Sequence, residues 1–178
     1  METKRTTTFA TLLIALATCA CSGKHEETAV KNEEAAPLPV SLVKMNDTAA
    51  GNQLLSGFYN IEGNAWRWTS GKFSVLLGVP AAAGQSGGTL TLNFTIPDVV
   101  IKHLPKITLT ASVNGKPLGS DTYAKAGVGV FTADVPKELL TGESVKVDFA
   151  LDKDLAPGTA GDSRELGIIA NSVGLASR

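Results

Sequence analysis

Residues 89–96 read Thr-Leu-Thr-Leu-Asn-Phe-Thr-Ile, and polar and apolar side chains alternate along this stretch without a break. The same alternation, with a period of two, governs residues 107–113 and 145–151. Successive side chains of a β-strand point to opposite faces of its sheet, so each stretch has one face for a core and one for solvent. This pattern is typical of antiparallel sheets.

Turn signals separate the alternating stretches. Asn114-Gly115 directly follows residues 107–113 and predicts a hairpin, because both positions tolerate a positive φ. The glycine-rich residues 84–88 predict a loop, and residues 136–140 predict a single helical turn that begins at proline. Because no run keeps helical spacing over 12 residues, we expect no long helix.

Short strands at regular spacing predict the fold class. We expect an all-β fold, an antiparallel two-sheet β-sandwich of jelly-roll or immunoglobulin-like type with about eight to nine strands. A closed barrel is the alternative. The candidate strands lie near residues 54–57, 65–69, 72–79, 89–96, 106–113, 117–124, 128–135, 144–151 and 166–175.

Length and charge bound the class of protein. The chain has 178 residues, with 16 Lys and Arg against 17 Asp and Glu. That length suits one domain with a sizeable core and short extra segments. The net charge of −1 argues against nucleic acid as a partner, because such proteins normally carry a basic field.

The N-terminal segment predicts secretion. Lys4 and Arg5 precede a short apolar run over residues 9–20. A span of the bilayer core needs about 20 apolar residues, so this run is too short to be one. A positive start, a short apolar run and small residues at its end are the pattern of a secretory signal peptide.

The end of this segment resembles the lipobox of a bacterial lipoprotein signal peptide. In that resemblance Ala20 precedes the cut and Cys21 becomes the lipidated N-terminus, carrying acyl chains such as palmitate. Cys19 is the alternative site, but Thr18 is a poor residue directly before a cut. Ser22, in place of Asp, implies sorting to the outer membrane. A further alternative is an ordinary signal peptide with incidental cysteines.

These observations predict three segments. Residues 1–20 form the signal peptide, residues 21–50 the lipidated Cys21 and a flexible tether, and residues 51–178 the β-sandwich domain. The tether prediction rests on its mixed charges, its prolines and its lack of aromatic residues. Residues 39–44 also fit the start of a first strand. No cysteine follows Cys21, so we expect no disulfide and no thiolate site in the domain.

Chemistry-bearing residues are few. His103 is the only histidine of the predicted domain, which excludes a zinc site of several histidines. We expect His103 in a surface loop. Four loop carboxylates suggest calcium or a glycosidase pair as alternatives to ordinary solvated carboxylates, which we favour. They are Asp152, Asp154, Asp162 and Glu165. We therefore predict no catalytic residue, no metal and no cofactor.

Half of the ten aromatic residues fall within residues 58–73. Trp66 and Trp68 are two positions apart, so they share one face of a strand and Arg67 faces the other way. An exposed pair of indoles would offer a stacking platform for sugars. The alternative, which we favour, is that both indoles fill the core, because the domain has few other large side chains.

Several short motifs of residues 52–178 resemble a bacterial β-sandwich module. They are Gly57-Phe58-Tyr59, Trp66-Arg67-Trp68-Thr69, Asn114-Gly115 and Asp162-Ser163-Arg164-Glu165-Leu166-Gly167-Ile168. The module is found beside glycosyltransferase or methyltransferase domains of cell-surface polysaccharide synthesis. This chain departs from that setting, because we expect it to carry the module alone behind the lipid anchor and the tether, with no catalytic domain.

The predicted function is a lipid-anchored, non-catalytic protein of the cell envelope with a carbohydrate-binding-like module. Arg164 or Arg67, together with Tyr59 or one of Trp66 and Trp68, would hold an acidic or neutral glycan. For Arg164 the alternative is a structural role that fixes its loop to a neighbouring strand. For the whole protein the alternative is a structural or interaction lipoprotein that docks an envelope protein, for example by strand addition. The expected partners are the membrane, through the lipid, and either a glycan or an envelope protein.

Overall fold

The computed structural model describes residues 37–178, which form one compact unit. The predicted signal peptide, Cys19, Cys21 and the first part of the predicted tether lie outside the described residues. No helix within residues 37–178 has the length and apolar character needed to cross a membrane.

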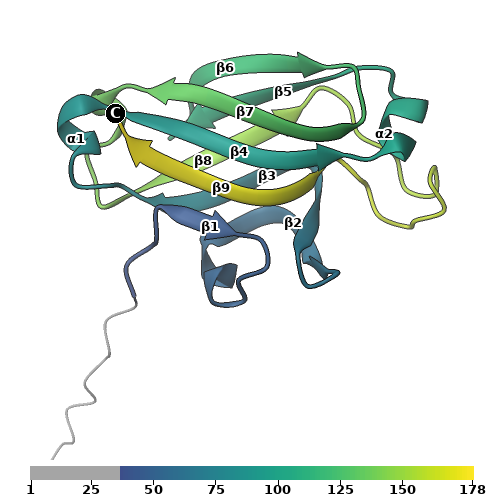
Figure 1. The fold of residues 1–178 in the computed structure, drawn as a ribbon, viewed down its shortest axis with the longest axis horizontal. Helices are drawn as coiled ribbons and strands as arrows, with labels where there is room; N and C mark the ends of the chain where they lie inside the picture. Colours follow the sequence, from purple (N-terminus) through teal and green to yellow (C-terminus); the bar gives the residue numbers. More distant parts are fainter. Residues whose placement is uncertain (1–36) are drawn as a thin grey trace, which may run out of the picture. The chain divides into compact units, whose positions relative to one another are not determined.

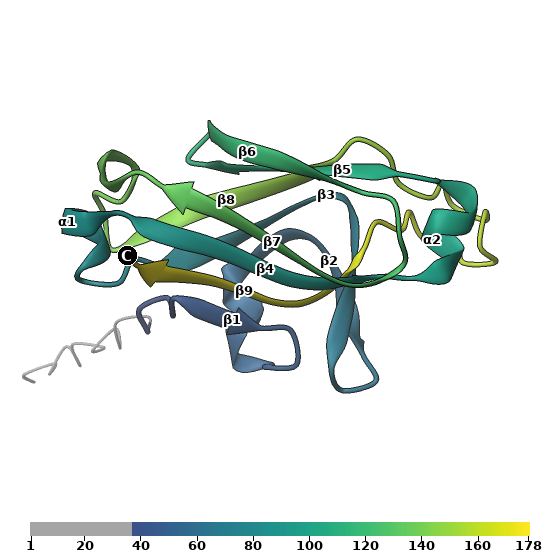
Figure 2. The same cartoon turned by 45° about the horizontal axis from the view of Figure 1, so that its top comes forward.

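The strands form two layers, which confirms the predicted all-β antiparallel sandwich (Figures 1 and 2). One layer has the order β1-β9-β4-β7, and the other has the order β2-β3-β8-β5-β6. The first contains β1 (Leu42–Lys44), β9 (Ile169–Ser177), β4 (Gly88–Ile96) and β7 (Gly127–Val135). The second contains β2 (Leu54–Glu62), β3 (Trp66–Gly78), β8 (Ser144–Leu151), β5 (Ile107–Val113) and β6 (Lys116–Tyr123).

The two layers are joined along one side. The first residues of β3 pair with the start of β9, through Arg67 opposite Ala170 and Trp68 opposite Ile169. Strand pairing therefore runs from one layer into the other on this side. On the opposite side, β6 and β7 are the edge strands (Figure 1).

Short helical segments connect the strands. They are η1 (Ala49–Gln53), α1 (Ala83–Ser86), α2 (Asp98–His103) and η2 (Lys137–Leu139). η2 confirms the single turn predicted after Pro136. His103 is exposed, as the sequence predicts, but it is the last residue of the short helix α2 and not part of a loop.

Three strand boundaries differ from the prediction. β2 continues to Glu62 where the prediction ends at residue 57, and β3 is one strand where two were expected. The turn at Gly63 and Asn64, with φ of 56° and 53°, joins β2 to β3. β9 begins at Ile169 rather than at residue 166, because Leu166 instead forms an isolated bridge with Leu155.

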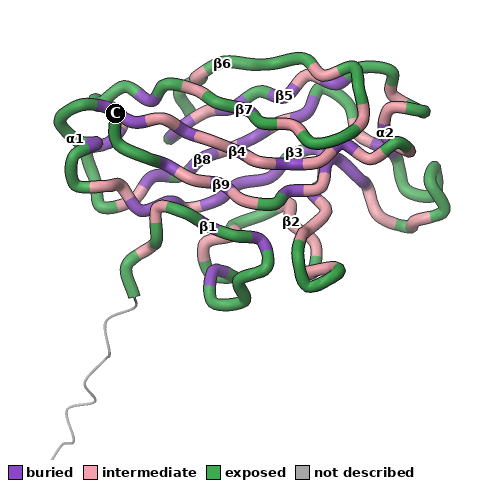
Figure 3. The backbone as a smooth tube through the Cα atoms, viewed as in Figure 1, coloured by how far each residue is buried: buried purple, intermediate pink, exposed green. Residues whose placement is uncertain are grey.

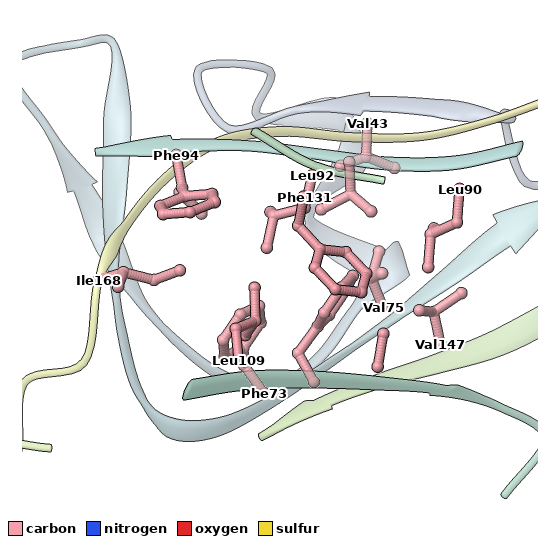
Figure 4. Packing of buried hydrophobic residues seen from close by; sticks show 14 of the residues in the cluster. Val43, Phe73, Val75, Leu90, Leu92, Phe94, Leu109, Phe131, Val147 and Ile168 are labelled. Carbon is pink, nitrogen blue, oxygen red and sulfur yellow. The ribbon is translucent and has the colours of Figure 1, made fainter. Parts of the chain in front are cut away.

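Aliphatic side chains and phenylalanine rings together fill the space between the layers (Figure 4). Phe73 on β3 stacks on Phe149 on β8, with 5.0 Å between ring centroids. Phe149 in turn meets Phe131, on β7 of the other layer, edge to face at 6.3 Å. Figure 3 shows the matching alternation of buried and exposed positions along the strands. The alternation of residues 89–96 is confirmed, because all the even-numbered side chains from Leu90 to Ile96 are buried.

The fold includes part of the predicted tether, because β1 pairs with β9. Gln53 fixes the chain just before β1: its Nε2 donates to the carbonyls of Val40 (2.9 Å) and Leu76 (2.7 Å). Its Oε1 accepts from the amide of Val40 (3.1 Å). The amide of Gly78 also donates to Val40 (3.0 Å). The chain is therefore held in the sandwich from Val40, and not from residue 51.

Candidate functional site

Arg164 lies at the centre of an ionic cluster at one end of the sandwich. It contacts Asp162 through both carboxylate oxygens, at 2.7 Å from Nη2 to Oδ2 and 3.0 Å from Nε to Oδ1. Its Nη1 donates to Oε1 of Glu62, at the end of β2 (2.7 Å). Arg164 thus fastens the segment after β8 to the β2–β3 hairpin. This is the structural role predicted as the alternative to ligand binding.

The ionic contacts shift the titration of both partners. Hydrogen bonds from the side chain and backbone of Arg164 lower the pKa of Asp162 to about 2. The contact with Asp162 contributes most to a raised pKa of Arg164, followed by that with Glu62. A carboxyl with a lowered pKa stabilises the fold above its unfolded value and loses that contribution as pH falls. This contact therefore weakens between about pH 4 and pH 2.

Tyr59 lies against the same cluster. The guanidinium carbon of Arg164 is 4.9 Å from the centroid of the Tyr59 ring. The Tyr59 hydroxyl donates to the carbonyl of Glu165 (2.7 Å). Burial, followed by the charge of Glu165, raises the pKa of Tyr59. The ring and hydroxyl of Tyr59 thus help to hold the segment of Arg164 and Glu165 on β2.

Arg67 lies near Tyr59 but binds backbone. Its Nε donates to the carbonyl of Met45 (3.1 Å), and its Nη1 donates to the carbonyl of Tyr59 (3.0 Å). The guanidinium thereby connects the turn after β1 to β2. The structure brings Arg67, Tyr59 and Arg164 together, and each of the three contacts neighbouring segments of the chain.

Both indoles are half-buried, which lies between the two alternatives of an exposed stacking platform and a place in the core. Trp68 packs against the core cluster. Trp66 lies over the turn, where its ring covers Gly63: a side chain at Gly63 would begin 2.6 Å from the ring. The Nε1 of Trp66 is buried and has no hydrogen-bond partner among residues 37–178. The platform of Tyr59, Trp66, Trp68 and the two arginines stays a prediction.

The four loop carboxylates do not converge on one point. Asp152 accepts from the amide of Thr108 (2.6 Å), and Asp162 pairs with Arg164. Asp154 lies beside Glu165, whose Oε1 accepts from the amide of Gly71 (2.8 Å). Within the described part of the chain, no group of three or more His, Cys, Asp or Glu residues is arranged to hold a metal ion.

Asp154 and Glu165 form a close acidic pair. Burial, followed by the charge of Glu165 and a hydrogen bond with it, raises the pKa of Asp154. Glycosidase carboxylates stand roughly 5–10 Å apart on either side of a sugar, whereas Glu165 accepts from the amide of Gly71 and its charge acts on the neighbouring Asp154. The pair is arranged to hold the segment after β8 against the bend of β3 at Gly71.

We expect Asp154→Asn to stabilise the domain at neutral pH. A carboxyl with a raised pKa contributes stability below its unfolded pKa and loses it as pH rises through the folded pKa. The amide removes this loss and can still donate a hydrogen bond to Glu165. The melting temperature of the variant should therefore exceed that of the wild type at about pH 7, with a smaller difference near pH 4.

The control for this prediction is Glu143→Gln, which changes an exposed carboxylate that forms no ion pair among the described residues. This control should melt like the wild type at both pH values. An equal gain for Asp154→Asn at both pH values would contradict the interpretation of the acidic pair.

A groove of about 480 Å³ lies on the outer face of the β1-β9-β4 layer. We call it the threonine groove. Hydroxyl, amide and small side chains dominate its lining, Leu42 and Pro80 add apolar surface, and no charged side chain takes part. The lining residues are Ser41, Leu42, Pro80, Thr89, Thr91, Asn93, Gly174, Leu175, Ala176 and Ser177.

Strand pairing explains the hollow. Gly174, on β9, lies between Leu42 on β1 and Thr91 on β4. A side chain at Gly174 would begin 3.0 Å from Cδ1 of Leu42, so the glycine allows the Leu42 side chain to lie close over β9. Thr89 faces Ala176 in the same way. The residues of β9 that line the groove, Gly174 and Ala176, are smaller than their neighbours on β1 and β4, and this difference in size creates the groove.

Asn93 is oriented at one end of the groove. Its Nδ2 donates to Oγ of Ser172 on β9 (3.0 Å). One amide hydrogen and the amide oxygen keep capacity for further hydrogen bonds. With the hydroxyls of Thr89 and Thr91, Asn93 presents neutral donors and acceptors along one strand.

Two other grooves differ in their lining. One of about 190 Å³, on the outer face of the other layer, is lined in part by the charged Lys72 and Asp148. One of about 450 Å³ lies between residues 37–40 and η1, and includes Asp47. The threonine groove is the uncharged one of the three.

The threonine groove could not be predicted from the alternation of residues 89–95. That pattern predicts solvent-facing polar side chains, and these lie half-buried on the outer face of the layer. The available signal was Gly174, a glycine inside a predicted strand, since a glycine in a strand marks a gap or a close approach. The partners of Gly174 on β1 and β4 come from the sheet topology.

No protein-family model matches the chain, and no curated protein sequence matches it. Among solved structures, it is similar to a family GH115 4-O-methyl-α-glucuronidase with specificity for decorated arabinogalactans. The identity is 12% over 81% of this chain and 18% of that chain, with a TM-score of 0.48. The chain therefore spans less than a fifth of that enzyme's length.

Two further similar structures are carbohydrate-binding modules. A family 35 module from Clostridium thermocellum is 11% identical over 76% of this chain and 98% of that chain, with a TM-score of 0.47. The CBM36-1 domain of a multidomain xylanase from the hindgut metagenome of Trinervitermes trinervoides is 12% identical over 77% and 96%, with a TM-score of 0.42. All three TM-scores lie below 0.5.

Proposed function

We propose that this chain is a non-catalytic glycan-binding module of the cell envelope, held at the outer membrane by a lipid on Cys21. The observation that carries the proposal is the threonine groove, which is large enough to hold part of an oligosaccharide and has no charged side chain in its lining. The envelope location rests on the resemblance of residues 1–21 to a lipoprotein signal peptide.

The groove has the chemistry that a sugar ring requires. Sugar hydroxyls both donate and accept hydrogen bonds, and the side chains of Thr89, Thr91 and Asn93 do the same. The C–H faces of a sugar need apolar contact, which Leu42 and Pro80 supply on the rim. Because no charge lines the groove, nothing in it compensates for burial of a charged sugar. The expected ligand is therefore a neutral glycan.

Thr91→Ala combined with Asn93→Ala tests the proposal. The soluble chain of residues 22–178 is applied to an array of neutral and acidic oligosaccharides. We expect the wild type to bind neutral members. We expect the double variant to bind them about 5- to 100-fold more weakly, because each lost hydrogen bond is worth roughly 0.5–1.5 kcal/mol. Both side chains point out of the core, so the fold should persist.

Two controls locate the site. Thr110→Ala combined with Ser112→Ala removes the same kind of groups from the outer face of the other layer and should leave binding unchanged. Trp66→Ala tests the predicted aromatic platform and should also leave binding unchanged. Loss of binding in a folded Trp66→Ala variant would move the site to that platform. A wild type that binds no member of the array would overturn the proposal.

The anchor is tested separately in cells that produce the full chain. Labelling with palmitate should be lost in Cys21→Ser and kept in Cys19→Ser. Labelling that persists in Cys21→Ser would place the lipid elsewhere.

A further inference from the structure

Two exposed valines lie on the outer face of β7, beside the threonine groove. Val128 is 87% exposed and Val130 is 49% exposed. Val130 is the pairing partner of Asn93 and Val128 is that of Thr95, so the valines share the outer face with these residues of β4. Asn93 also lines the groove. The two valines, which we call the valine strip, therefore continue the surface of the groove across β4.

The polar residues of β4 beside the valine strip bind towards β9, on the other side of β4. Nδ2 of Asn93 donates to Oγ of Ser172 (3.0 Å), and Oγ1 of Thr95 donates to Oδ1 of Asn171 (3.4 Å). Both hydrogen bonds are made away from β7, because β4 lies between β9 and β7 in the layer. The strip therefore presents methyl groups to solvent next to a groove of neutral polar groups.

The strand that carries the strip is held in place. The Tyr123 hydroxyl donates to the carbonyl of Val130 (3.1 Å), and the Tyr123 ring meets Phe94 edge to face at 5.0 Å. The Phe94 ring lies under Gly129, between the two valines, because a side chain at Gly129 would begin 2.6 Å from Cε2 of this ring. A surface that is ordered before binding loses less conformational entropy when a ligand binds.

The outer face of β7 is polar at the other end of the groove. There Asp134 is the pairing partner of Thr89, which also lines the groove, and Asp134 forms an ion pair with Arg178 (3.2 Å). A ligand that extends from the groove over β7 thus meets an ion pair at the Thr89 end and methyl groups at the Asn93 end. The two ends of the site therefore differ in the substituents that they accept.

We propose that the valine strip is a subsite of the glycan site and selects a sugar that carries a methyl group. A deoxyhexose whose terminal carbon is a methyl group, or an O-methylated sugar, has this chemistry. The inference rests on the proposed function, because the strip adjoins the groove that we assign to the glycan. A sugar hydroxyl that faces the strip loses water without gaining a hydrogen bond. A methyl group in the same place buries apolar surface on both molecules, which is favourable.

Matched sets of neutral oligosaccharides test this selection. Residues 22–178 are applied to an array that holds each hexose-terminated oligosaccharide beside its deoxy form and its O-methylated form. We expect the wild type to bind methyl-bearing members about 3- to 10-fold more tightly than their parents, the gain from burial of one methyl group. A preference in either series supports the proposal, and the series in which it occurs identifies the substituent.

Val128→Thr combined with Val130→Thr removes apolar surface and keeps the shape of both side chains. Threonine is β-branched and suits an exposed strand position, so the fold should persist. We expect the preference for methyl-bearing members to disappear and binding of the parents to stay within about 3-fold of the wild type. Val40→Thr is the matched control, because it makes the same change at a valine that is 51% exposed and does not line the threonine groove. This control should keep the preference.

Nuclear magnetic resonance detects the contact itself. In a chain with isotope-labelled valine methyl groups, the signals of Val128 and Val130 are identified by their loss in the single threonine variants. The remaining valine signals report whether each variant is folded. Addition of the methyl-bearing oligosaccharide that binds most tightly should shift the signals of Val128 and Val130 and leave that of Val40 in place.

The outcomes separate the subsite from the groove. The subsite is overturned by a wild type that binds parents and methyl-bearing members equally, by a double variant that keeps the preference, or by strip signals that do not shift on binding. Each of these results leaves the groove as a glycan site. A wild type that binds no member of the array overturns the proposed function, and the subsite with it.

Discussion

Phe149→Ala should lower the free energy of unfolding by about 3–5 kcal/mol, the usual cost of removing a buried phenylalanine ring. Phe149 is 2% exposed and contacts rings from both layers, Phe73 at 5.0 Å and Phe131 at 6.3 Å. The rings sit in three different strands, so no single side chain can move to fill the cavity. For a domain of this size we expect the melting temperature to fall by roughly 10 °C.

Differential scanning calorimetry of the variant measures this loss. Leu55→Ala is the matched control. It likewise removes an apolar side chain from a strand of the second layer, but this side chain is 45% exposed. It should cost less than about 1 kcal/mol. Equal melting temperatures for the two variants would mean that the stacked rings around Phe149 are not the centre of the core.

Gly57→Ala should cost about 2–5 kcal/mol of unfolding free energy, from a backbone penalty and a clash. Gly57 has a φ of +74°, which side chains with a Cβ disfavour. The added methyl group would also lie 2.6 Å from Cα of Phe73 and 2.7 Å from its Cβ, which are parts of the structure that cannot turn away. The pairing of β2 with β3 shifts register at this residue, between Ser56 and Phe58.

Gly51→Ala is the control for this effect. Gly51 has no positive φ, and nothing lies within 4 Å of the added methyl group. The same substitution there should be neutral or stabilise by a few tenths of a kcal/mol through the unfolded chain. Chemical denaturation of both variants gives the comparison. Similar losses at the two positions would mean that the bend at Gly57 is not required.

Local patterns predicted most of the strands. The strand at residues 89–96 could be predicted from the local sequence alone, because the position of a side chain along a strand decides which face of the sheet it occupies. The hairpin at Asn114-Gly115 is confirmed for the same reason: φ values of 48° and 77° are a local property of the turn. The turn at Gly63 and Asn64 carried a similar signal, and its omission explains why β2 was predicted too short.

The site depended on contacts between distant residues. Arg164 stands between nearby acids in the sequence, which suggested a structural role, but its partner Glu62 lies 102 positions away. The threonine groove needs three strands in one order, with Gly174 in the middle. Neither arrangement is encoded in a short window. The glycine and the arginine were visible in the sequence, and their neighbours were not.

The attachment of Val40 by Gln53 has a mechanical consequence. Any pull on the chain before residue 37 reaches the sandwich at Val40, whose carbonyl is held by Gln53 and by the amide of Gly78. Gln53 also holds Leu76, so tension is divided between β1 in one layer and β3 in the other. The force therefore loads both sheets together instead of peeling β1 away first. A domain built in this way can stay folded while the chain before residue 37 is under tension.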